Sequence, residues 1–75
     1  MSKLPALAAR DVVRIAEKLG FEFDRQKGSH AVYVRMSDKR RIVIPMHKGR
    51  DLKTGTLRGL IDDMDLSVDE FIAML

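Results

Sequence analysis

The fold is decided by residues 21–45, which read FEFDRQKGSHAVYVRMSDKRRIVIP. Two runs in this stretch, residues 21–26 and 32–36, alternate in side-chain type, which is the periodicity of a β-strand. Residues 41–44, which are mostly apolar, read as a third strand. Lys27-Gly28-Ser29 and residues 37–40 connect them as short turns, and Pro45 ends the third strand because proline has no N–H to donate to a neighbouring strand. Such short connections predict an antiparallel meander of three strands.

Helical spacing appears on both sides of the strands. Before them, four apolar residues recur at i, i+3, i+4 and i+7 and predict a helix from Ala9 to Leu19 that lacks a good capping side chain: Val12, Ile15, Ala16 and Leu19. After them, the same spacing predicts a second helix capped by Thr54: Leu57, Leu60, Ile61 and Met64.

A third helix is predicted over residues 68–75 from its start signals. Ser67 and Glu70 have the spacing of a capping box, and Leu66 and Phe71 have that of a hydrophobic staple. The whole pattern predicts an α+β fold with the order α-β-β-β-α and a short extra C-terminal helix.

Length and composition indicate one small globular domain over residues 1–75. The chain has 75 residues, of which 45% are hydrophobic, enough for a single core. It has no cysteine, which excludes disulfide scaffolds, zinc fingers and thiol catalysis. No stretch approaches the about 20 apolar residues that cross a bilayer, and no signal peptide is visible, so we expect a cytoplasmic protein without membrane contact.

The charge is distributed unevenly along the chain. Residues 1–50 contain 12 Lys and Arg and 5 Asp and Glu, a formal charge of +7, whereas residues 51–75 contain 2 and 6, a charge of −4. A basic segment suits a polyanion such as nucleic acid, because Lys and Arg displace counterions from phosphates. The alternative is a solvated surface that happens to be patchy.

Most classes of catalytic chemistry have no matching residues. The five glycines are scattered and form no phosphate-binding loop. The two histidines lack metal-ligand spacing, and Asp62, Asp63 and Asp65 fit a solvated helix face better than a magnesium site. We therefore expect neither a metal nor a cofactor.

His30 and His47 are the candidates for chemistry, because each stands among cations where a loop meets a strand. An imidazole can exchange a proton near pH 7, and Lys27, Lys48 and Arg50 can hold phosphate oxygens. These groups suffice to cleave RNA, because the attacking 2′-hydroxyl belongs to the substrate. The alternative is that both histidines are ordinary surface residues.

The sequence resembles the HicA (YcfA-like) mRNA interferase toxins over nearly its whole length, from about Leu4 to Leu75. The stretch Arg25-Gln26-Lys27-Gly28-Ser29-His30, followed by a Pro-x-His and a Leu-Lys-x-Gly-Thr-Leu motif, is the specific part of the resemblance. The remaining matches are Leu4-Pro5, Val12-Val13, Glu17-Lys18-Leu19-Gly20-Phe21, Ile44-Pro45-Met46-His47 and Leu52-Lys53-Thr54-Gly55-Thr56-Leu57-Arg58.

The resemblance implies a double-stranded-RNA-binding-like fold and a metal-independent endoribonuclease that cuts mRNA. It also implies neutralisation by a HicB-type antitoxin. His30 matches the catalytic histidine of the family, Gly28 the turn glycine and Ser29 the small residue beside the imidazole. His47 matches the second motif and is expected to assist catalysis or bind substrate.

The sequence departs from the family pattern at two places. Ala31 stands where members often carry a second histidine, which removes a paired-imidazole mechanism there. Ala8-Ala9 replaces the usual Ser-Gly at the first helix start, a change that concerns stability rather than catalysis.

Two other functions are compatible with the same residues. The chain can be a non-catalytic RNA-binding module of this fold, although Asp62 and Asp63 follow Lys53 and Arg58 and weaken a duplex-binding surface. It can also bind only a protein partner. Tyr33 is a base-stacking platform in the first case and a packing residue otherwise, while Met36 and Met46 are expected in the core.

Overall fold

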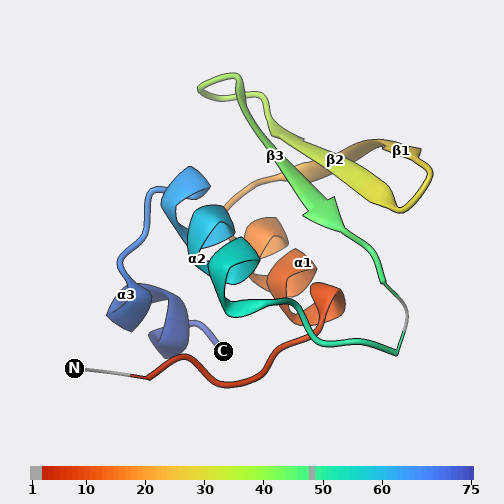
Figure 1. The fold of residues 1–75 in the computed structure, drawn as a ribbon. Coiled ribbons are helices and arrows are strands. Elements are labelled where there is room, and N and C mark those ends of the chain that lie inside the picture. Colours follow the sequence, from red (N-terminus) through yellow and green to blue (C-terminus); the bar gives the residue numbers. More distant parts are fainter. Residues whose placement is uncertain (1–2, 48) are drawn as a thin grey trace.

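A computed structural model describes residues 3–47 and 49–75. Within these ranges the chain forms an α+β fold in which three strands are preceded by one helix and followed by two (Figure 1). The elements are α1 (Ala9–Lys18), β1 (Glu22–Lys27), β2 (His30–Arg35), β3 (Arg40–Pro45), α2 (Thr54–Asp63) and α3 (Val68–Ala73). The predicted order, including the extra C-terminal helix, is confirmed.

The three strands form one antiparallel sheet in the order β1-β2-β3, as the short connections predict. The helices lie on one side of this sheet, where α1 and α2 contact β3 and α3 packs beside α2 (Figure 1). A bulge between Phe23 and Arg25 shifts the register of β1, so that Lys27 pairs with His30. His30 in turn pairs with Pro45 of β3.

The core lies between the sheet and the helices. Alternate residues of β2 and β3 are buried on the helix side, where they meet the apolar stripes of α1 and α2. Its main members are Val12, Ile15, Ala16, Phe21, Ala31, Tyr33, Ile42, Ile44, Leu57, Leu60, Ile61, Met64 and Phe71. Met46 packs against this core as expected, but Met36 is 61% exposed, so its predicted core position is wrong.

The start of α1 has a capping hydrogen bond that the sequence pattern did not reveal. Ala8 is the N-cap and offers no capping side chain, but its N–H donates to Asp11 Oδ2 at 3.0 Å. Asp11 thus satisfies one backbone donor and places a negative charge in the first turn. The helix ends at Lys18, one residue before the predicted end, and Gly20 follows with a φ of +92°.

The predicted N-cap of α2 is wrong, and the predicted capping box of α3 is correct. Thr54 is the first residue of α2, and the N-cap is Lys53, which makes no side-chain capping bond. The capping box of α3 is confirmed, because Glu70 N–H donates to Ser67 Oγ at 3.0 Å and Ser67 N–H donates to Glu70 Oε1 at 2.8 Å. None of the described helices is long and apolar enough to cross a membrane.

The end of the sheet that joins α1 is held by Arg35. Its guanidinium lies 4.6 Å from the centre of the Phe21 ring and donates to Leu19 O and to both carboxylate oxygens of Asp38. The hydrogen bond from Arg35 lowers the pKa of Asp38 from 3.8 to about 2. Arg35 therefore stabilises the fold through its contacts with Phe21, Leu19 and Asp38.

Candidate active site

The hairpin between β1 and β2 sets the position of His30. Lys27 pairs with His30, so Gly28 and Ser29 are the two central residues of the turn. Gly28 has a φ of +59°, and Ser29 is outside the left-handed region. Glycine with positive φ at the first central position is the pattern of a type II′ turn, which suits the twist of a hairpin.

His30 is exposed on the face of the sheet that the helices leave open. Its neighbour Ala31 is only 1% exposed and faces the helices, so the alternation of β2 turns His30 the other way. Lys27 lies beside His30 on one neighbouring strand and Pro45 on the other. The imidazole is thus accessible and has a cation next to it.

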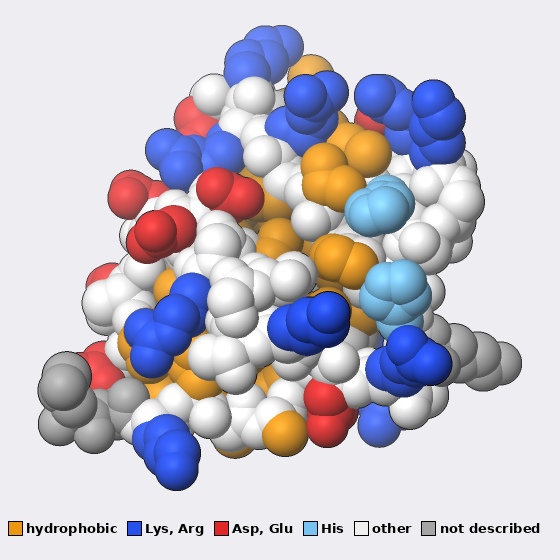
Figure 2. Space-filling model, in the orientation of Figure 1, with side chains coloured by type: hydrophobic (Ala, Val, Ile, Leu, Met, Phe, Trp, Pro, Cys, Tyr) orange, Lys and Arg blue, Asp and Glu red, His pale blue; other side chains and the backbone are white. Residues whose placement is uncertain are grey.

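The segment that carries His47 is attached to the same turn. Met46 N–H donates to Ser29 O, and Pro45 already pairs with His30. Both histidines are exposed, and the histidine side chains in Figure 2 lie on one face of the molecule, with apolar atoms between them and Lys and Arg side chains nearby. The structure therefore brings together two residues that are far apart in the sequence.

The segment is also held by backbone contacts with the chain at the start of α1 and by one contact within itself. Ala8, at the beginning of α1, forms an antiparallel β-bridge with Asp51. Leu52 N–H donates to Leu7 O at 2.7 Å, and Arg50 N–H donates to His47 O at 3.2 Å. These backbone contacts fix the path of the chain between β3 and α2.

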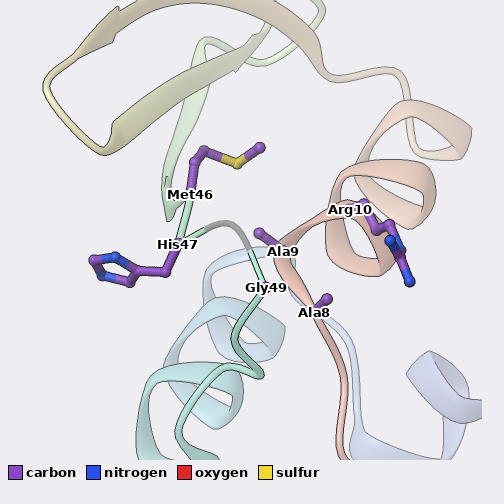
Figure 3. A pocket seen from close by; sticks show the side chains of 6 residues that line it. All are labelled: Ala8, Ala9, Arg10, Met46, His47 and Gly49. Carbon is purple, nitrogen blue, oxygen red and sulfur yellow. The ribbon is translucent and has the colours of Figure 1, made fainter.

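Two pockets flank His47. The first, of about 280 Å³, has mostly apolar walls, where the side chain of Met46 points toward α1 and the imidazole of His47 extends to the opposite side (Figure 3). Its lining residues are Ala8, Ala9, Arg10, Met46, His47 and Gly49. The second, of about 310 Å³, is more polar and is lined by Pro45, His47, Arg50, Asp51, Leu52, Lys53 and Thr56.

The predicted site residues fall into two groups around the paired strands. Lys27, Gly28, Ser29 and His30 form the hairpin end, while His47 and Arg50 share the second pocket. Lys48, also predicted to bind RNA, lies outside the described residues. Sequence reasoning considered Lys53 only for the duplex-binding alternative and assigned no role to Thr56, although both belong to the Leu-Lys-x-Gly-Thr-Leu motif that could have drawn attention to them.

Tyr33 is a packing residue and not a base-stacking platform. It is 7% exposed and makes an edge-to-face contact with Phe23, with ring centres 5.7 Å apart. Burial raises the pKa of its hydroxyl.

In residues 3–47 and 49–75, no three or more His, Asp or Glu side chains come together in a group that could hold a metal ion.

Comparison with known proteins gives the family of the chain. None of the curated proteins matches the chain. A family model described as the HicA toxin of bacterial toxin–antitoxin systems matches residues 9–66, from the first helix to the segment before the third. That range contains the hairpin turn, both histidines and both pockets apart from Ala8 at the edge of one. The chain belongs to the HicA toxin family.

Proposed function

We propose that this toxin is a metal-independent endoribonuclease that cuts mRNA in the cytoplasm, with His30 as its general acid and base. The observation that carries the proposal is the position of His30. It is exposed at a rigid strand end, next to Lys27, and the segment with His47 and Arg50 is hydrogen-bonded to its turn. Lys27, Gly28, Ser29, Lys48 and Arg50 are the proposed RNA-binding residues.

The chemistry follows from these groups. His30 takes the proton of a ribose 2′-hydroxyl, and the oxygen attacks the adjacent phosphorus. The bond from phosphorus to the 5′-oxygen breaks, which leaves a 2′,3′-cyclic phosphate, and His30 returns the proton to the 5′-oxygen. Lys27, beside His30, stabilises the negative charge that develops on the oxygens of the phosphate that is cut, and Arg50 holds a neighbouring phosphate. His47 assists by donating a hydrogen bond to the substrate from the segment that follows β3.

The proposed protein partner is a HicB-type antitoxin that neutralises the toxin by covering this surface. The support is the family assignment together with the exposure of His30, Lys27 and Arg50, which an inhibitor must shield from RNA.

The decisive experiment is induction of the chain in cells beside its His30→Ala variant, with growth and total mRNA followed after induction. We expect growth arrest and mRNA loss with the parent. The variant should have neither, because loss of general acid–base catalysis lowers the rate roughly 10²–10⁴-fold. Circular dichroism of the purified variant checks that the fold is intact.

The other outcomes separate the alternatives. Arrest and mRNA loss that persist in His30→Ala contradict the role of His30 and transfer the test to His47→Ala. Arrest without mRNA loss in both proteins indicates a non-catalytic RNA-binding module. Absence of arrest in both contradicts the proposed toxin activity for this chain.

A further inference from the structure

The pocket between His47 and the start of α2 contains more positive charge than the proposed mechanism uses. Arg50 enters from the segment after β3, and Lys53 enters from the N-cap position of α2. Among the residues that the structure describes, the three ion pairs connect Arg25 with Asp24, and Arg35 and Arg40 with Asp38. Arg50 and Lys53 are in none of them, so their charges are not satisfied by a carboxylate.

The remaining polar groups of the pocket suit a phosphate. Thr56 offers a hydroxyl donor one helical turn after Lys53, on the same side of α2. His47, which also lines the pocket, offers a ring N–H. Phosphate oxygens are commonly bound by cationic and hydroxyl donors that come from separate segments of a chain. A volume of about 310 Å³ leaves room for such a group.

Asp51 is the exception, because it places a carboxylate in the same pocket. Its backbone forms the bridge to Ala8, and no side-chain hydrogen bond of Asp51 is seen in the described part of the chain, so the fold does not require the charge. A carboxylate repels a dianion more strongly than a monoanion. An internal RNA phosphodiester carries one negative charge, whereas a terminal phosphate monoester carries close to two at neutral pH, since its second pKa is about 6.

We infer that this pocket is a subsite for an internal phosphodiester of the RNA strand, bound by Arg50, Lys53 and Thr56, in which Asp51 discriminates against terminal phosphates. The inference rests on the proposed ribonuclease function and extends it along the strand, to a phosphate next to the one that is cut. It gives the Leu-Lys-x-Gly-Thr-Leu motif a role in binding and explains why cations and a carboxylate share one pocket. A toxin with this subsite engages RNA within the chain rather than at its ends.

The test uses two small probes that the protein cannot cut and follows backbone amide signals by NMR. One is a 2′-O-methyl dinucleoside phosphodiester, and the other is a nucleoside 5′-monophosphate at pH 7.5. We expect both to shift the amides of Arg50, Lys53 and Thr56. Lys53→Gln should lower the affinity for both probes about two- to fivefold, which is the effect of losing one partly exposed charge. Arg58→Gln removes the same charge from an exposed residue of α2 that does not line the pocket, and it should not weaken the binding of either probe.

Asp51→Asn tests the discrimination. It should raise the affinity for the monophosphate by at least about twice the factor by which it raises that for the phosphodiester, because the monophosphate has the additional charge. Equal factors for the two probes contradict the role of Asp51. Equal effects of Lys53→Gln and Arg58→Gln, or no shift of the pocket amides with either probe, contradict the subsite itself.

These outcomes are independent of the cleavage experiment. If the probes behave as expected but the chain does not degrade mRNA, the proposed catalysis fails while the subsite stands. If degradation depends on His30 but Lys53→Gln behaves like Arg58→Gln, the ribonuclease function stands and the subsite is wrong.

Discussion

Among single residues, Gly28 has the clearest consequence for the site, because it determines how the hairpin presents His30. Its φ is +59°, and a Cβ built there would meet no atom within 4 Å, so alanine would be opposed by the backbone alone. Gly59 in α2 is equally open but helical. We expect Gly28→Ala to lower the free energy of unfolding by about 1–2 kcal/mol and Gly59→Ala to raise it by about 0.5–1 kcal/mol. Urea unfolding measures both.

Gly28→Asn is the control, since asparagine is, with glycine, among the residues that occupy the positive-φ position of such hairpin turns, and it should recover part of the loss. Equal stability of Gly28→Ala and the parent would show that the turn does not depend on this conformation. Neither the exposure of His30 nor the burial of Tyr33 could be predicted, because alternation assigns residues to two faces without saying which face the helices cover.

Among the elements, α3 has only six residues, so its start signals should carry much of its local stability. We expect Ser67→Ala to lower the free energy of unfolding by about 1 kcal/mol, because the Glu70 N–H would lose its capping oxygen. Ser37→Ala is the matched control in the exposed turn before β3 and should change stability by less than about 0.5 kcal/mol. Thermal unfolding of both variants makes the comparison, and equal effects would argue against the cap.

Local sequence signals predicted the start of an element correctly where the residues that stabilise it lie close together in the sequence. The start of α3 was correct because Ser67 and Glu70 bond to each other's backbone. The start of α2 was wrong by one residue, because its N-cap is Lys53 and no side chain caps it. The second strand was predicted to begin at His30, directly after the turn, and β2 does begin there, where His30 pairs with Lys27 and Pro45.

For the whole molecule, the site could not be predicted as a unit. His30 and His47 share a face because the β2–β3 register pairs His30 with Pro45 and because Ser29 accepts a hydrogen bond from Met46. The polar pocket further needs the bridge between Ala8 and Asp51, which connects two distant segments. Contacts of this kind leave no periodic pattern in the sequence. The family motifs pointed to the residues, but only the fold shows which of them meet.

The uneven charge gives a prediction for the whole molecule, because the proposed site lies at only one end of the sheet. Lys27 lies beside His30, whereas Lys39 lies in the turn between β2 and β3, at the other end of the sheet (Figure 1). For binding to 2′-O-methyl RNA, which lacks the attacking hydroxyl, Lys27→Gln should reduce the slope of log affinity against log salt by about 0.7 to 1, the value for one phosphate contact. Lys39→Gln removes the same net charge and should leave the slope unchanged. If both variants reduce it equally, RNA is attracted by net charge alone, and the site at His30 does not define its path.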